Sequence, residues 1–294
     1  LEANPEDVSA TAVAAWIRAG VNRVTVGVQT TLPTHARHLG RAHSARQARA
    51  AVSLLRDSEL GSVGLDLIFG VPGQSLADFA ADLSFAVESK VDHVSLYGLT
   101  VEAGTRFAER GVPEADGDAW REMYDEGVRT LERAGLHRYE VSNFARPGHR
   151  AQHNEHYWRA RHWAGLGPSA HGWRPDGTRV ARPAAWDDWS TGAPSLEERP
   201  EPRALLRELL WSTLRHGDGA DRARLRALTG IEVRLPAALA NGDLATIVGD
   251  RVRLQDAGYP LADAISEAIW TASVAGGPRH PIDDGAYLPG AAGD

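Results

Sequence analysis

Strands and helices alternate along the first half of this chain, and this alternation constrains its fold more than any other feature. Residues 23–29, 63–69, 92–99 and 137–141 are predicted strands, and residues 7–19, 44–55, 75–89 and 118–134 are predicted helices. These spacings fit strand–helix–strand units, which predict parallel strands with right-handed crossovers. The strand at 63–69 is nearly all apolar, as expected for a strand buried on both faces.

Polar residues and glycines stand where the predicted strands end. They are Glu2, Gln29, Asp66 with Gly70, and Tyr97 with Thr100. In a β/α barrel the carboxyl ends of the strands form the active face, so these residues mark the candidate functional edge. The first strand is almost absent, because Glu2 already stands where a strand would finish.

Composition excludes several classes of function. The chain has 294 residues, of which 43% are hydrophobic, enough for one large domain and a smaller one. Its net charge of -7 gives no nucleic-acid footprint. No apolar run reaches about 18 residues, so no membrane-spanning helix is expected. The N-terminal residues do not resemble a signal segment, which favours a cytoplasmic location. Because the chain has no cysteine, disulfides, thiolate metal sites and thiol nucleophiles within it are excluded.

The second half of the chain has a different pattern. Residues 174–200, rich in Pro, Gly, Trp and Asp, are predicted to be a linker or surface loop. Residues 201–275 are expected to form a small domain with helices at 204–215, 221–228, 235–240 and 261–270 and a hairpin at 245–248 and 251–254. This order resembles a winged helix. The Gly- and Pro-rich tail, 276–294, is expected to be disordered.

The strand-end residues suit one kind of ligand. Gln29 follows Val26-Gly27-Val28, Arg41 ends Leu39-Gly40-Arg41, and Asp66 is a carboxylate inside an apolar strand, which is costly unless it is paired. Carboxylates can hold an ammonium group or ribose hydroxyls, and arginine can hold a carboxylate. Together they suit a zwitterionic, adenosine-bearing ligand, although a lone glutamine or arginine more often lies on the surface or in a packing contact.

A second motif is His153-Asn154-Glu155-His156-Tyr157-Trp158. If this segment is helical, its two imidazoles lie on one face. Histidine ligates haem iron, zinc, copper or non-haem iron, and Tyr157 and Trp158 could stack on a macrocycle. The alternative is a polar loop whose histidines bond to backbone carbonyls. His171 is a further candidate with weaker context.

Taken in order, these segments resemble the radical S-adenosylmethionine family of oxygen-independent coproporphyrinogen III oxidases, and especially its haem-chaperone branch, HemW. The resemblance runs from Glu2 to about Trp173 and continues weakly to about residue 272. It depends on Asp66-Leu67-Ile68-Phe69-Gly70-Val71-Pro72-Gly73-Gln74, on Glu140-Val141-Ser142-Asn143-Phe144-Ala145 and on Gly165-Leu166-Gly167-Pro168-Ser169-Ala170-His171. The motif at residues 153–158 is typical of the chaperone branch rather than of the decarboxylating oxidase.

The resemblance implies an α/β fold: an incomplete (β/α) barrel over residues 1–173 that lacks its first strands, followed by a mostly helical, winged-helix-like domain. It implies that S-adenosylmethionine is contacted by Glu2, Gln29, Arg41, Asp66 and Thr100. It also implies haem or porphyrin contacts from His153, His156, Tyr157, Trp158 and His171, with His153 and His156 as candidate iron ligands. Partners would be haem and haem-accepting proteins, including membrane-associated ones.

The chain departs from the family in one large respect. The family holds a [4Fe-4S] cluster with a CxxxCxxC loop, and this chain has no cysteine, so as written it cannot hold that cluster or cleave the cofactor reductively. An N-terminally truncated HemW-like protein is the favoured explanation, and a cysteine-free relative is the other. Three functions stay open: haem binding and delivery, a radical porphyrinogen decarboxylase in the full-length form, and an interaction module at residues 201–275.

Overall fold

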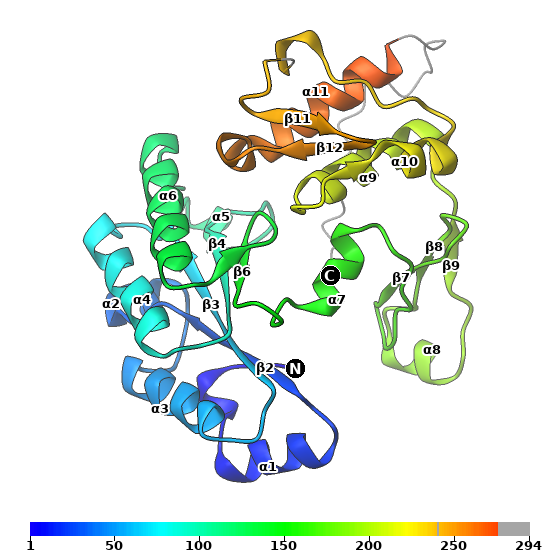
Figure 1. Cartoon of the computed structure of the whole chain (residues 1–294). Helices are drawn as coiled ribbons and strands as arrows, with labels where there is room; N and C mark the ends of the chain where they lie inside the picture. The colour runs from blue at the N-terminus through cyan, green and yellow to red at the C-terminus, as the bar shows by residue number, and fades with distance from the viewer. Residues whose placement is uncertain (240, 276–294) are drawn as a thin grey trace. The chain divides into compact units, whose positions relative to one another are not determined.

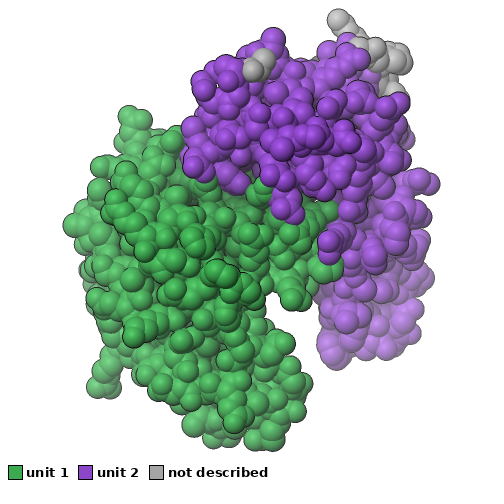
Figure 2. Space-filling model, viewed as in Figure 1, with its two compact units in different colours: residues 1–159, 215–217 green, residues 160–214, 218–294 purple. Residues whose placement is uncertain are grey.

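The computed structural model describes residues 1–239 and 241–275 and divides the chain into two compact units. Unit 1 contains Leu1–Arg159 and Arg215–Gly217, and unit 2 contains Ala160–Leu214 and Asp218–Asp294 (Figure 2). The chain therefore leaves unit 1 earlier than the boundary expected at residue 173. The expected disordered tail at 276–294 lies outside the described residues.

Unit 1 is built on a six-stranded sheet within the described part of the chain, in the order β1-β2-β3-β4-β6-β5 (Figure 1). The strands are β1 (Glu2–Ala3), β2 (Arg23–Gln29), β3 (Ser62–Phe69), β4 (His93–Gly98), β5 (His137–Arg138) and β6 (Asn143–Ala145). The helices are η1 (Pro5–Asp7), α1 (Ala10–Arg18), α2 (Pro33–His38), α3 (Ala45–Arg56), α4 (Leu76–Glu88), α5 (Arg106–Glu109), α6 (Gly117–Arg133) and α7 (Gln152–Trp158).

Local sequence signals explain where these elements begin and end. The side chains of Ser9, Ser44 and Ser75 each accept a hydrogen bond from a backbone N–H in the first turn of α1, α3 and α4. Gly20 follows α1 with a φ of 86°, a left-handed conformation that glycine adopts readily. The predicted strand at 23–29 and the parallel pairing of β1, β2, β3 and β4 are confirmed.

The sheet has two different faces. Residues 63–69 were expected to be buried on both faces, and all of them are buried except Asp66 and Ile68, which are half-buried. Partners across the strands share a face. One row is Val26, Leu65, Val94 and Phe144, all of them fully buried in the core formed with α1, α3, α4 and α6. The next row is Gly27, Asp66, Ser95 and Asn143. The strands therefore present an apolar face to the helices and a more polar face on the other side.

The expectation of another parallel strand at 137–141 is wrong. β5 pairs antiparallel with β6, and β6 pairs antiparallel with β4. Only a few residues separate β5 from β6, whereas a parallel connection needs a crossover of about a dozen residues or more. β5 and β6 therefore form an antiparallel hairpin at the β4 end of the parallel strands.

Unit 2 contains two small sheets in its described residues, in the orders β7-β8-β9 and β10-β12-β11. Its strands are β7 (His171–Trp173), β8 (Arg179–Ala181), β9 (Leu196–Glu198), β10 (Ala220–Asp221), β11 (Ala245–Val248) and β12 (Arg251–Leu254). Its helices are α8 (Trp186–Ser190), α9 (Pro202–Leu214), α10 (Arg222–Thr229), η2 (Ala237–Leu239), η3 (Asp256–Leu261) and α11 (Ala262–Val274). The predicted hairpin is confirmed, with Val248 paired to Arg251.

Two expectations about unit 2 need correction. Residues 174–200 carry β8, α8 and β9, and these strands pair antiparallel, so the segment is more than a linker. Turn-forming residues between short strands are typical of small antiparallel sheets as well as of loops. The helix expected at 235–240 is a short 3-10 turn, because Pro236 and Gly242 leave too few residues between them for an α-helix. Residue 240 itself lies outside the described residues.

Candidate functional site

Two of the predicted ligand contacts, Glu2 and Asp66, lie within strands on the polar face of the sheet, and Gln29 ends its strand. We call Glu2, Gln29, Arg41 and Asp66 the strand-end cluster. Glu2 belongs to β1, Gln29 ends β2, Asp66 lies in β3, and Arg41 follows α2. The charges of Glu2 and Arg41 both act on the Asp66 carboxyl group, the first raising and the second lowering its pKa. Residues far apart in the sequence therefore share one electrostatic environment.

Asp66 is the most perturbed member of this cluster. Burial raises its pKa from 3.8 to about 6, a hydrogen bond from Ser95 acts in the opposite direction, and the Glu2 carboxylate adds to the increase. The guanidinium groups of Arg23 and Arg41 lower the pKa but do not cancel the effect of burial. An acid with such a perturbed pKa on the polar face of a sheet is a candidate ligand-binding group.

Gln29 lies over a glycine that leaves room for it. A Cβ atom placed on Gly27 would come within 2.9 Å of Gln29 Nε2 and 3.8 Å of Asn4 Oδ1. Arg41 NH1 donates to that same Asn4 Oδ1 at 3.2 Å. Gln29 is 8% exposed, and its Oε1 has no hydrogen-bond partner among the described residues. A buried acceptor without a partner suggests that a ligand donor completes this site.

Thr100 and Arg41 line the same pocket. The pocket has a volume of about 350 Å³. Its lining comes from the segment after α2, from β3, and from the residues between β4 and α5 with the start of α5. The lining residues are Leu39, Arg41, Ile68, Leu99, Thr100, Glu102, Thr105, Arg106 and Phe107. A cavity at the carboxyl ends of parallel strands, with a few charged groups among apolar ones, is typical of small-molecule sites.

The polar face of the sheet contains groups that sequence reasoning missed. On β4, His93 and Ser95 are both buried, and His93 Nε2 lies 2.8 Å from the Tyr139 hydroxyl. Burial also raises the pKa of Glu140, which is fully buried, to about 7. For β4 the sequence does contain a pattern that predicts a polar face. His93, Ser95 and Tyr97 alternate with apolar residues, and this period of two is typical of a strand with one polar face.

The motif at residues 153–158 forms helix α7, so both histidines lie on one helical face as the sequence argument required. His156 Nδ1 lies 2.8 Å from the Gln152 carbonyl oxygen. Since a carbonyl only accepts, this nitrogen carries the proton and Nε2 carries the lone pair. His153 Nε2 instead lies 3.0 Å from the Tyr157 hydroxyl, and the two rings meet edge to face at 4.8 Å.

Buried groups of unit 1 contact one side of helix α7. The N–H of Ala151, the residue before the helix, donates to the Tyr139 hydroxyl at 3.3 Å. The Glu155 carboxylate is 13% exposed and lies 3.1 Å from Arg159 NH2 and 3.5 Å from His216 Nε2. These contacts anchor one side of the helix, while His153 is exposed and His156 partly so. His171 begins β7 in unit 2 and is exposed.

Comparison with known proteins shows the family of this chain. Residues 1–86 match the family model of the Radical SAM superfamily. Over 278 residues the chain is 37% identical to the protein named haem chaperone HemW of Mycobacterium tuberculosis (strain H37Rv), covering 91% of this chain and 70% of that one. It is 40% identical over 172 residues to the HemW of Escherichia coli (strain K12), covering 58% of this chain and 46% of the relative. The matched part thus spans about half the length of that relative.

A solved structure shares the fold. Coproporphyrinogen III oxidase (HemN) from Escherichia coli, described as a radical SAM enzyme, aligns with a TM-score of 0.74 over 92% of this chain and 69% of its own, at 17% identity. The fold is therefore that of a radical SAM protein with a mixed α/β sheet and a helical C-terminal region. The chain belongs to the HemW- and HemN-like family of radical SAM proteins.

The residues present fit some of the family's groups and not others. A [4Fe-4S] cluster needs thiolate ligands, and this chain has no cysteine, so its residues do not fit the cluster. The Gln29 Oε1 atom, which has no partner among the described residues, and the charged groups of Arg41 and Asp66 fit a zwitterionic, hydroxyl-bearing ligand. The described residues contain no helix long and apolar enough to cross a lipid bilayer.

Proposed function

We propose that this chain binds haem through helix α7 and passes it to acceptor proteins. The observation that supports this most directly is His156. Its Nδ1 donates to the Gln152 carbonyl oxygen at 2.8 Å, which directs the lone pair to Nε2. Histidines that ligate metal through one nitrogen commonly donate the other N–H to a carbonyl or carboxylate, which fixes the ring and its tautomer. Relatives that share the family are named haem chaperones.

Within this proposal His156 is the iron ligand, and His153 has a different role. The Nε2 of His153 is already engaged with the Tyr157 hydroxyl at 3.0 Å, so ligation through that atom would first break this contact. We propose that His153, Tyr157 and Trp158 contact the porphyrin. His171 belongs to unit 2 and stays a separate candidate for porphyrin contact, tested by its own substitution.

Haemin titration of the 294-residue chain, followed through the Soret band, tests this proposal. The His156→Ala variant should weaken haemin binding by at least about tenfold, which corresponds to ~1.4 kcal/mol. Added imidazole should restore the Soret band of that variant, because it can occupy the space of the missing ring. His137→Ala is the matched control, since His137 is an exposed histidine on β5 paired with Glu132.

The outcomes separate the parts of the proposal. If the wild-type chain gives no saturable Soret change, it does not bind haem in this way and the proposal is wrong. If binding is saturable but His156→Ala leaves it unchanged, the ligand is another residue, and His153→Ala and His171→Ala identify which one. An equal loss in His137→Ala would show that the effect is not specific to α7.

We also propose that the strand-end cluster and Thr100 contact S-adenosylmethionine. Arg41 would hold its carboxylate, Glu2 and Asp66 its ammonium group or ribose hydroxyls, and Gln29 Oε1 would accept from one of its donors. The pocket that contains Arg41 and Thr100 supports this assignment. When bound beside a cluster, this cofactor supplies radical chemistry, but no step of that kind is proposed for this chain. The cytoplasm is the proposed location, and haem-accepting proteins are the proposed partners.

A further inference from the structure

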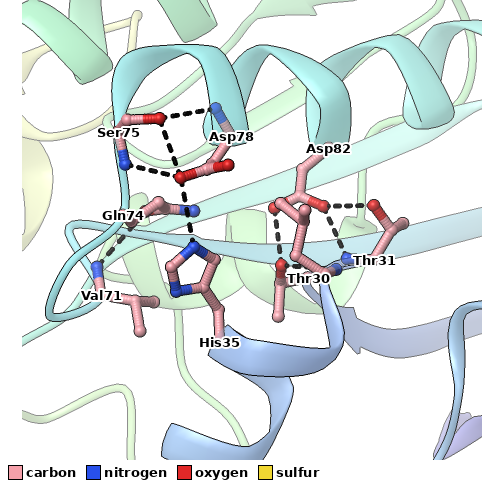
Figure 3. A network of polar contacts seen from close by, with 9 residues as sticks. Thr30, Thr31, His35, Val71, Gln74, Ser75, Asp78 and Asp82 are labelled. Atoms are coloured by element: carbon pink, nitrogen blue, oxygen red, sulfur yellow. Dashed lines mark hydrogen bonds and ion pairs between the residues drawn. The ribbon is translucent and has the colours of Figure 1, made fainter.

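A buried carboxylate on α4 holds the loop that follows β2. Asp82 is fully buried, and three donors surround it (Figure 3). The Thr30 hydroxyl donates to Oδ2 at 2.8 Å, and both the N–H and the hydroxyl of Thr31 donate to Oδ1 at 2.6 Å. Burial raises the pKa of Asp82, and these hydrogen bonds lower it without cancelling the effect of burial. Each oxygen of the Asp82 carboxyl group nevertheless has at least one donor.

These contacts begin at the residue after Gln29. The backbone of Gln29 has a φ of 64°, a conformation that residues other than glycine adopt rarely. The pairing of β2 with β3 also shifts its register between Gly27 and Gln29. Thr30 N–H donates to the Val28 carbonyl oxygen at 2.7 Å, so the chain bends sharply around Gln29. Such a bend persists only where neighbouring contacts hold it.

A second contact joins α4 to α2, the helix that follows this loop. Asp78 lies four residues before Asp82, on the same face of α4. Its Oδ2 accepts from the Ser75 N–H at 2.9 Å and lies 3.4 Å from His35 Nε2, as Figure 3 shows. His35 belongs to α2, which follows the loop. Helix α4 therefore holds both the start of the loop, through Asp82, and the helix after it, through Asp78.

We infer that Asp82 is a positioning residue for the cofactor edge: by binding Thr30 and Thr31 it sets the bend that places the Gln29 amide over Gly27, beside Asn4 and Arg41. The importance of this for a ligand rests on the proposed S-adenosylmethionine site. The conformation of Gln29 is independent of that proposed site, because it follows from contacts within unit 1. Asp82 contacts no proposed ligand group itself, so it acts only through the loop.

The test compares Asp82→Asn with Asp92→Asn in the full chain. Asp92 is a matched control: it is 8% exposed, accepts from the Val63 N–H at 2.9 Å and pairs with Arg56 at 2.9 Å, but it precedes β4, away from Gln29. Two measurements are made on each variant. Hydrogen exchange measures the exchange rates of the backbone amides of Thr31 and Leu32. NMR reports the side-chain amide resonances of Gln29, assigned with Gln29→Ala.

In Asp82→Asn we expect faster exchange at Thr31 and shifted Gln29 resonances, with neither change in Asp92→Asn. Calorimetric titration with S-adenosylmethionine should show a dissociation constant about tenfold higher in Asp82→Asn and unchanged in Asp92→Asn. If Asp82→Asn does not fold, Thr31→Val replaces it, since that change removes one hydroxyl donor and keeps the carboxylate.

The remaining outcomes keep the two proposals apart. Unshifted Gln29 resonances in Asp82→Asn overturn the positioning role, whatever the ligand does. If the wild type binds S-adenosylmethionine and Asp82→Asn binds it with the same affinity, the positioning role is also overturned. Shifted resonances in Asp82→Asn, together with no binding by the wild type, support the positioning role and reject the S-adenosylmethionine site.

Discussion

Replacing Asp66 with asparagine should stabilise this protein at neutral pH. Burial raises the pKa of Asp66 from 3.8 to about 6. A difference of one in pKa is worth about 1.4 kcal/mol, so ionisation of this group at pH 8 lowers the free energy of unfolding by about 3 kcal/mol. Asparagine is similar in shape, can keep the contact with Ser95 and carries no charge. The pKa of about 6 already includes the attraction of Arg23 and Arg41, so we expect a net gain of about 2–3 kcal/mol.

The pH dependence of this gain follows from the direction of the pKa change. Below pH about 3.8 the carboxyl group is protonated in both states, so Asp66→Asn and the wild type should be similarly stable. As pH rises toward about 6, the unfolded chain ionises before the folded one, and the wild type loses stability. Above pH about 6 the difference should stay constant.

Urea unfolding between pH 4 and pH 8, followed by far-UV circular dichroism and tryptophan fluorescence, measures this difference. Asp92→Asn is the control and should be less stable than the wild type at pH 8, because it loses an ion pair with Arg56. A gain in Asp66→Asn that is equally large at pH 4 and pH 8, or a loss at pH 8, would refute the argument. A gain that is equally large at both pH values would mean that asparagine improves packing. A loss at pH 8 would mean that the surroundings stabilise the ionised carboxylate of Asp66.

Two further substitutions test the surroundings of the site. Burial raises the pKa of Glu140 from 4.5 to about 7, so the wild type should lose stability as pH rises through this interval, and Glu140→Gln should lack that part of the decline in urea unfolding. Gly98→Ala should destabilise the fold by about 1–3 kcal/mol, because its Cβ would lie 2.3 Å from Trp120 Nε1, whereas Gly117→Ala, with no atom within 4 Å, should be neutral in thermal unfolding.

Much of the fold of both units follows from local pattern. The strand at 23–29 and the hairpin at 245–254 have the predicted bounds, because alternation and turn residues act over a few positions. Ser44 and Ser75 stand at predicted helix starts for the same reason. Local pattern was insufficient for β5 and β6. Their direction depends on which strand they meet, and that is a long-range contact.

The candidate site also contains residues that local pattern predicts and residues that only long-range packing reveals. Glu2, Gln29 and Asp66 could be proposed as candidates because the order of elements predicts which polar residues lie in parallel strands or at their ends. Asp82, Thr30 and Thr31 could not, since an aspartate inside an amphipathic helix looks like a surface residue until the helix is packed. The partnership of Glu155 with His216 is hidden for a similar reason, as the chain returns to unit 1 only for a short segment.

By itself, the sequence determined the alternation of elements, the helix caps, the family resemblance and the two groups of candidate ligand residues. Each of these depends on residue type and on spacings of a few positions. The tertiary structure decided which residues share an environment: Asp66 with Glu2 and Arg41, Gln29 over Gly27, and Asp82 beneath the loop. The physical reason is that burial and long-range pairing set the charge, tautomer and backbone conformation of a side chain. These properties exist only once distant segments have packed together.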